Sequence, residues 1–221
     1  MSDDVCTVTF VAGGDISIEI TARFNLIVAQ CTGPTRFKYP TGGGVDGDFA
    51  AGWASEKFFD TTPGMTATST SMPSAMEGDP APSRSTKHTY DPGGGIIIAH
   101  MNSATFDPAG QAENFVTFQF SARKIPWITG NTADMVFRAL IKQDDRFFEG
   151  PGFEVQAVDF LWLPLTTGAC LTQNSFQEQG TMANPDFGRP MQFGYATANS
   201  GAGAPVVDRE GLLDNFRVEV R

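Results

Sequence analysis

Apolar and polar residues alternate with a period of two along much of this chain, a pattern typical of β-strands that bury one face. The final stretch from Leu212 to Arg221 shows it well, with Phe216, Val218 and Val220 on one face and charged residues between them. Further strands are predicted at 96–100, 116–121, 135–142 and 153–162, the last ending before Pro164, and another begins at 191. No segment has a strong helical period. The pattern therefore predicts an all-β, antiparallel β-sandwich with long irregular loops.

The N-terminal region carries the clearest strand signal of the chain. Residues 5–11 form one predicted strand, Gly13-Gly14 the turn, and residues 16–28 a second strand whose even-numbered positions are all apolar. A hairpin centred on Gly13-Gly14 places Cys6 opposite Thr21, which disfavours a disulfide between Cys6 and Cys31.

Glycine and proline divide the chain into two predicted parts. Gly33-Pro34 and the triple glycine 42–44 suggest a joint, so we expect a β-hairpin arm with linker at 1–44 and a jelly-roll domain at 45–221. Residues 61–95 are rich in Ser, Thr, Pro, Gly and Met, and are predicted to be an irregular loop that wraps its own domain or a neighbouring subunit.

Composition narrows the classes of partner. The 221 residues include 19 Phe, so an aromatic core is expected. The net charge of −10, from 25 acidic and 15 basic residues, repels phosphate and excludes nucleic acid and anionic membranes as direct partners.

The start of the chain and its cysteines point to a cytoplasmic origin. The N-terminus lacks the basic and apolar regions of a secretory signal, and no apolar run approaches the roughly 20 residues that cross a bilayer. Cys6, Cys31 and Cys170 have no metal-ligand spacing and are odd in number, so free buried thiols are predicted.

Three short motifs in order carry a family resemblance. They are Val45-Asp46-Gly47-Asp48-Phe49 followed by Gly52-Trp53, the alternating stretch 115–120, and Leu213-Asp214-Asn215-Phe216-Arg217-Val218 near the end. Together they resemble the galactose-binding-like jelly rolls of carbohydrate-binding modules over roughly residues 45–221. The resemblance implies sugar binding and a structural calcium ion at Asp48 and Asp214, with no other cofactor. Ala50 stands where the family pattern has Glu, and the hairpin lies outside that pattern.

Sugar binding requires exposed aromatic faces with polar groups at their edges. Trp127 precedes a turn that contains Asn131, and these two residues with Tyr90 and Tyr195 are the candidate ligand-binding residues. Trp53 and Trp162 are interpreted as core rings.

No catalytic signature accompanies this frame. Asp144, Asp145 and Glu149 flank Phe147-Phe148 and are interpreted as a charged turn between strands, the alternative being the carboxylate pair of a glycosidase. His88 and His100 lack a metal-ligand pattern, and neither glycine triplet ends as a phosphate loop does. The chain is therefore predicted not to be an enzyme.

The leading hypothesis is a structural or adhesive subunit of a bacteriophage-like virion, as a head decoration, spike or tail component assembled in a bacterial cytoplasm. Its expected partners are further copies of itself, other virion proteins and surface polysaccharide. The alternative is a free carbohydrate-binding module, with an extracellular location. A polysaccharide-degrading enzyme ranks third.

Overall fold

The computed structural model describes residues 4–12, 16–24, 31, 33–40, 52–60, 67–74, 83–90, 95–111, 114–124, 135–155, 162–167, 170–200 and 207–221. The chain forms two compact units, Met1–Gln30 and Cys31–Arg221. Within the described part, no helix is long and apolar enough to cross a membrane.

The first unit is an antiparallel hairpin of β1 (Asp4–Ala12) and β2 (Ile16–Phe24), which confirms the predicted hairpin. Its register differs from the prediction by one residue, because Cys6 pairs with Ala22 and not with Thr21. In this register, each even-numbered residue of one strand pairs with an even-numbered residue of the other. Even-numbered residues of both strands therefore share one face, and all of these even positions except Asp4 are apolar.

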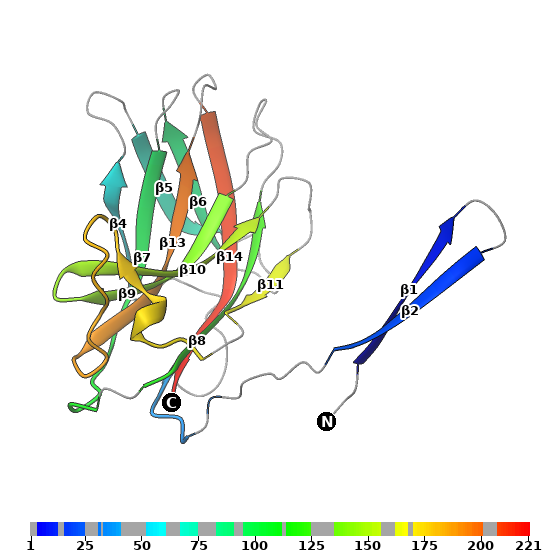
Figure 1. The fold of residues 1–221 in the computed structure, drawn as a ribbon. Coiled ribbons are helices and arrows are strands. Elements are labelled where there is room, and N and C mark those ends of the chain that lie inside the picture. Colours follow the sequence, from blue (N-terminus) through cyan, green and yellow to red (C-terminus); the bar gives the residue numbers. More distant parts are fainter. Residues whose placement is uncertain are drawn as a thin grey trace. The chain divides into compact units, whose positions relative to one another are not determined.

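The second unit is an antiparallel sandwich of two sheets, which confirms the predicted all-β jelly roll (Figure 1). Sheet I has the order β12 (Gln177–Glu178), β10 (Arg146–Val155), β9 (Met135–Gln143), β13 (Met191–Ser200), β7 (Gly95–Phe106) and β4 (Trp53–Asp60). Sheet II has the order β11 (Leu163–Thr166), β8 (Val116–Lys124), β14 (Val207–Val220), β6 (Ser83–Tyr90) and β5 (Ala67–Ser74), and β3 (Phe37–Tyr39) also pairs with β14.

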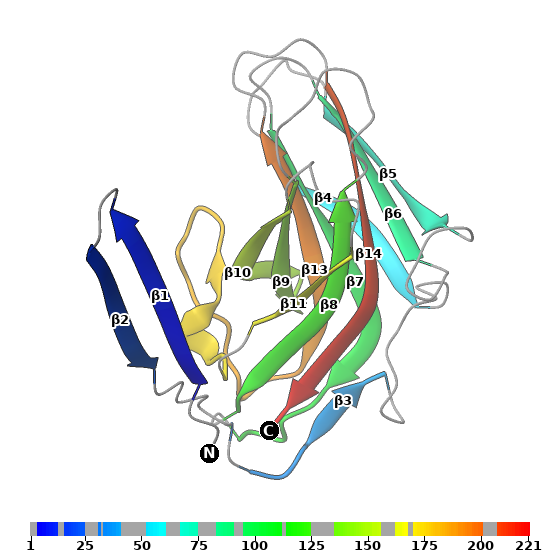
Figure 2. The ribbon, with the colours of Figure 1, turned by 90° about the vertical axis from the view of Figure 1, so that its right-hand side faces the viewer.

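The boundary predicted at residue 44 is wrong. Tyr39 pairs with Val218, and the Arg36 amide donates a 2.8 Å hydrogen bond to the Val220 carbonyl. Figure 2 shows β3 beside the lower part of β14. The sandwich therefore begins at Cys31, and part of the supposed linker is a strand of its second sheet.

The segment 61–95 is not wholly irregular as predicted, because it contains β5 and β6, which pair with each other. Its strands escaped detection because their inward positions carry Ser, Thr, Arg and His, so no apolar alternation marks them. Threonine is itself favourable in strands, which supports pairing without an apolar signal.

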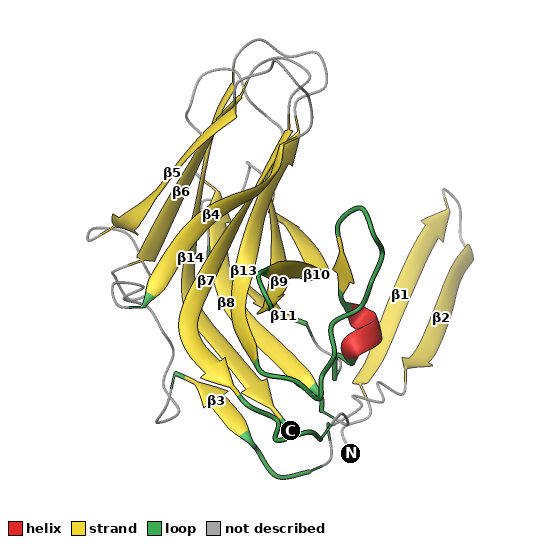
Figure 3. Cartoon of the chain, turned by 90° about the vertical axis from the view of Figure 1, so that its left-hand side faces the viewer, coloured by secondary structure: helices red, strands yellow, loops and turns green. Residues whose placement is uncertain are grey.

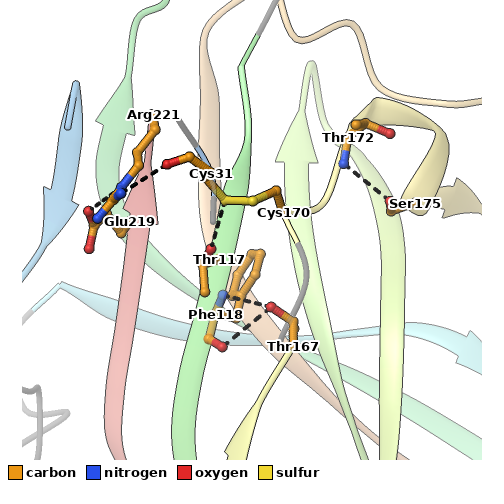
Figure 4. Close-up of a disulfide and its surroundings, with 9 residues drawn as sticks. All are labelled: Cys31, Thr117, Phe118, Thr167, Cys170, Thr172, Ser175, Glu219 and Arg221. Carbon is orange, nitrogen blue, oxygen red and sulfur yellow. Dashed lines mark hydrogen bonds and ion pairs between the residues drawn. A yellow bond between two sulfur atoms is a disulfide. The ribbon is translucent and has the colours of Figure 1, made fainter. Parts of the chain in front are cut away.

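A disulfide joins Cys31 to Cys170, so the prediction of free thiols is wrong for these two residues (Figure 4). Their Cα atoms lie 5.4 Å apart across a sequence separation of 139 residues. The Cys31 carbonyl also accepts a 3.0 Å hydrogen bond from Arg221, so the first and last residues of the sandwich lie side by side. The prediction failed because spacing alone does not show which distant cysteines a sandwich brings together.

The core is aromatic, as expected from the phenylalanine content. Among the described residues, the largest fully buried side chains are Tyr195, Ile96 and the phenylalanines at 118, 137, 148, 176, 187, 193 and 216. Phe216 meets Trp53 edge-on, with ring centroids 5.0 Å apart. The predicted packing of Trp53 against the core is confirmed.

The alternating pattern that predicted β14 changes phase once. A bulge lies between Asp214 and Arg217, with Asn215 at a φ of 55°. Leu213 and Phe216 therefore both reach the apolar core although they are three residues apart.

The two outermost strands of sheet II each contain a proline, Pro73 in β5 and Pro164 in β11. The strand predicted over 153–162 does end before Pro164, because β10 stops at Val155, and residues 156–161 lie outside the described part. Pro164 belongs to the separate strand β11, which lies at a sheet edge, where proline is tolerated. These prolines hinder the addition of a further strand at either edge.

At the β4–β5 side, the interior of the sandwich is polar. Among the described residues, the main apolar cluster includes none from β5 or β6. The sheets are joined there by a polar seam, which we define as Ser55, Ser71, Arg84, His88, His100 and Thr197.

Hydrogen bonds run through the seam from one sheet to the other. His100 Nδ1 lies 2.9 Å from Ser55 Oγ, and Arg84 donates to that same oxygen at 2.9 Å. His88 Nε2 and His100 Nε2 lie 2.9 and 3.0 Å from the Thr197 hydroxyl, which has a single proton and can donate to at most one of the two rings. Burial lowers the pKa of His100 well below its ordinary value, and the charges of Arg84 and His88 add to this effect. The ring is therefore neutral at pH 7.

Candidate functional site

A cleft of about 550 Å³ lies where β9 and β10 meet residues 174–182. The latter segment contains the 3-10 turn η1 (Gln173–Ser175) and β12. Figure 1 shows both beside β9 and β10, and Figure 3 marks η1 as a short helical turn. Arg138, Glu149 and Pro151 line the cleft from the strands, and Asn174, Gln177 and Met182 line it from the other segment.

Arg138 and Glu149 form an ion pair in the cleft. Arg138 belongs to β9, and Glu149 lies in β10 next to a bulge that ends at Gly152. Glu149 is only 8% exposed. Its Oε2 accepts a hydrogen bond from Arg138 Nη1, whereas its Oε1 and Arg138 Nε are buried without hydrogen-bond partners among the described residues. The pair thus holds one acceptor and one donor that no described residue uses.

A second pair, Arg146 and Glu178, fixes the other side of the cleft. Arg146 Nε lies 2.8 Å from Glu178 Oε1, and the Thr181 hydroxyl also donates to this carboxylate. These hydrogen bonds, with that of Arg146 the larger, lower the pKa of Glu178 to about 2. Glu178 is therefore ionised at neutral pH and is unsuited to act as a general acid.

Two buried phenylalanines anchor the segment opposite the strands. Phe176 and Phe187 are fully buried, with ring centroids 6.0 Å apart. Gln143 exchanges two hydrogen bonds with the Asp186 backbone, at 2.8 and 2.9 Å. Phe176 packs so closely on β10 that a Cβ at Gly150 would lie 2.5 Å from its ring. The cleft is therefore built before any ligand arrives.

Apolar surface in the cleft comes from Met182, which is 64% exposed and has a φ of 59°. Within the described part, the exposed large hydrophobic residues are Met72 and Met182, so no exposed aromatic ring is among them. A thioether is soft and polarisable, and it adapts to irregular apolar partners.

The predicted ligand-binding residues do not meet in this cleft. Tyr195 is completely buried and stacks on His100 at 4.5 Å, so the prediction that it offers an exposed ring is wrong. Its place in the inward-facing series of β13 explains the burial. Trp127 and Asn131 lie outside the described residues, as does the side chain of Tyr90 in β6.

The predicted calcium site stays a prediction. Asp48 lies outside the described residues, and Asp214 is buried with its Oδ1 accepting a 2.6 Å hydrogen bond from the Asn215 amide. No cluster of three metal-binding side chains occurs in the part of the chain that the structure describes.

The interpretation of residues 144–149 as a charged turn anchored by two phenylalanines is confirmed. Asp144 and Asp145 have φ values of 49° and 60° in the two-residue turn between β9 and β10, and Phe147 and Phe148 are buried. Trp162 lies just before β11, partly buried, with the Arg123 guanidinium 5.9 Å from its ring centroid.

Sequence reasoning considered Glu149 but missed Arg138 and the segment 174–182. The sequence does carry a signal there, since this segment and the residue before it contain an amide-rich run without apolar alternation, formed by Gln173, Asn174, Gln177 and Gln179. The amide side chains of such a run can each donate and accept hydrogen bonds.

No protein-family model matches the sequence, and no curated protein matches it. Solved structures that resemble it include the family 11 carbohydrate-binding module from Clostridium thermocellum in complex with a β-1,3-1,4-mixed-linked tetrasaccharide. That match has 12% identity and a TM-score of 0.45, and covers 79% of this chain and 94% of that one. The CBM22-1 xylan-binding domain from Paenibacillus barcinonensis Xyn10C matches at 13% identity and a TM-score of 0.40, over 87% of this chain and 97% of that one.

Proposed function

We propose that the sandwich binds a polysaccharide without catalysing its cleavage, in the cleft between β9, β10 and residues 174–182. The observation that carries this proposal is the lining of the cleft, which combines amide side chains, an ion pair with unused hydrogen-bonding atoms and one exposed thioether. The volume of about 550 Å³ lies within the range of small-ligand sites.

The chemistry of the lining suits sugars better than apolar or strongly charged ligands. Amide groups donate and accept hydrogen bonds, as sugar hydroxyls do. Asn174, Gln177 and Gln179 supply such groups along one side of the cleft. Met182 supplies apolar contact for C–H surfaces of a sugar ring.

The carboxylates argue against glycoside hydrolysis. Hydrolysis requires a protonated acid, whose pKa is usually raised, facing a second carboxylate. Arg146 holds the pKa of Glu178 at about 2, and Glu149 is paired with Arg138. We therefore propose a binding role, in agreement with the prediction that the chain is not an enzyme.

Binding is tested by affinity electrophoresis and calorimetry with soluble glucan, galactan, xylan and mannan. We expect at least one to bind with unchanged reducing-end content, and Gln179→Ala to weaken it. Gln119→Ala, an exposed glutamine on β8, is the matched control. Absence of binding to all four polymers, or equal loss in both variants, would refute the proposal.

The hairpin supports a second candidate, the structural subunit of a particle. Its register gathers apolar residues on one face, and an isolated two-stranded hairpin is marginally stable at best. Light scattering of the intact chain and of a chain lacking residues 1–28 tests this role. A defined oligomer that becomes a monomer on truncation supports an assembly arm, whereas two monomers oppose it.

The Cys31–Cys170 disulfide supports the extracellular alternative for location. Disulfides persist in oxidising compartments and are rare in the cytosol. A virion assembled in a reducing cytoplasm would acquire this bond only after release from the cell. Mass spectrometry of the non-reduced protein from its native source tests whether the bond is present there.

A further inference from the structure

We infer that Arg138 and Glu149 select uncharged sugars by binding two neighbouring hydroxyl groups, while Met182 packs against the C–H surface of the same ring. This inference rests on the proposed polysaccharide binding and adds the class of sugar and the residues that select it. It is carried by two polar atoms of the cleft that form no hydrogen bond with any described residue.

The two atoms without partners in the described part are complementary, since one is an acceptor and the other a donor. Glu149 Oε1 accepts hydrogen bonds and Arg138 Nε donates one, and both are buried without partners among the described residues. A buried polar atom without a partner is unfavourable, more so on a charged group. One sugar hydroxyl that donates to Oε1, with a neighbour that accepts from Nε, would satisfy both atoms at once.

The local backbone accounts for the placement of this pair. Glu149 pairs with Leu140 and Gly152 with Arg138, so β10 advances three residues while β9 advances two. The extra residue forms a bulge at Gly150-Pro151, and bulges redirect side chains next to binding sites. The pair thus lies where the regular ladder is interrupted, at the wall of the cleft.

A lining side chain must move for a hydroxyl to reach these atoms, because both lie beneath the cleft surface. Gln177 pairs with Glu149 across the β10–β12 ladder, and its side chain is exposed. A rotation of Gln177, which lines the cleft opposite Glu149 in the ladder, would give a ligand room beside the pair. The main chain on both sides is already fixed by β-pairing.

The charges of the cleft favour a neutral sugar over an acidic one. Glu149 and Glu178 line the cleft with Arg138, whose charge is already matched by Glu149. The pKa of Glu178 near 2 keeps this group ionised at neutral pH. Arg146 pairs with Glu178 in turn, so the four charges cancel. A carboxylate on the sugar would therefore find no unpaired cation among the described lining residues and would lose hydration without compensation.

Met182 is placed to cover the remaining face of such a ring. Its side chain is exposed and lines the same cleft. The turn that carries it is closed by a 3.1 Å hydrogen bond from the Met182 amide to the Glu178 carbonyl. The thioether therefore stands on a fixed turn.

The test compares neutral glucan and galactan with the same polymers oxidised at C6 to carboxylates, by calorimetry on the full chain. Wild type is expected to bind a neutral polymer at least tenfold more tightly than its oxidised form. Glu149→Gln is expected to weaken neutral binding about tenfold and to reduce the preference for the neutral form. Arg138→Lys and Met182→Ser are expected to weaken binding several-fold, and Met72→Ser, at an exposed methionine outside the cleft, to leave it unchanged.

The outcomes separate this inference from the function it rests on. If wild type binds no polysaccharide, the proposed function fails. If wild type binds neutral polymer but Glu149→Gln and Arg138→Lys bind it equally well, the role inferred for this ion pair is wrong while the proposed function stands. Equal binding of neutral and oxidised polymer by wild type also overturns the inference. Met182→Ser changes only an exposed side chain, so its result stands even if a buried variant fails to fold.

Discussion

Replacing Cys31 and Cys170 by serine is expected to remove a large part of the stability of the sandwich. The bond closes a loop with a sequence separation of 139 residues. In the chain-entropy model, a loop of this length stabilises the native state by about 5 kcal/mol at 25 °C, because it restricts the unfolded chain. Domains have total stabilities of about 5–15 kcal/mol, so the loss would be evident.

The assay is unfolding in guanidinium chloride, followed by tryptophan fluorescence. With a denaturant slope of about 3–5 kcal/mol per molar, a loss of about 5 kcal/mol lowers the midpoint by about 1–2 M. The slope itself should rise, since an unfolded chain without the cross-link exposes more surface. Reduction of wild type with dithiothreitol should reproduce the shift.

Cys6→Ser is the matched control, because Cys6 takes no part in this bond. Its midpoint should equal that of wild type. A double variant whose midpoint also equals that of wild type would refute the reasoning, since the cross-link would then not restrain the unfolded chain.

Three further predictions concern the seam and the cleft. The pKa of His100 is lowered in the folded state, so below pH 6.5 the unfolded chain binds more protons, and the free energy of unfolding should fall by up to about 1.4 kcal/mol per pH unit as pH decreases. His100→Asn should flatten this slope between pH 6.5 and 5.5. An unchanged slope would contradict the lowered pKa of His100. Gly150→Ala should lower the thermal midpoint by several degrees because its Cβ would meet the Phe176 ring, and an unchanged midpoint would mean that Phe176 repacks without cost. Arg146→Ala should raise the pKa of Glu178 from about 2 towards 4.5, as measured by NMR titration. In wild type, the stability that this pair contributes should be present above pH 4.5 and lost as pH falls towards 2. An unchanged pKa in the variant would show that another group holds Glu178 ionised.

The fold class followed from the sequence because period-two patterns are set by local geometry. The hairpin, β9 and the end of β14 each alternate in this way, and each was predicted. The strands β5 and β6 were missed because they face a polar seam, where buried Ser, Arg and His replace the apolar residues that mark a strand. Such a strand is recognised only when its hydrogen-bond partners are known.

The candidate site was harder to predict because its members are distant in sequence. Glu149 drew attention as part of an acidic group, but its partner Arg138 lies eleven residues away across a hairpin. Tyr195 was misjudged because an aromatic residue with a hydroxyl suits a sugar site and a core equally well. The Cys31–Cys170 bond depends on long-range packing that no local pattern reveals.

Because Arg221 contacts Cys31, the two ends of the sandwich lie close together, and the sandwich is suited to insertion into another protein. A unit whose two ends meet is grafted into a surface loop of a host protein with little disturbance, and its chain is readily reopened elsewhere. A short linker from Arg221 to Cys31 would close the sandwich into a circular permutant, with new ends placed at the exposed Ala109-Gly110 turn.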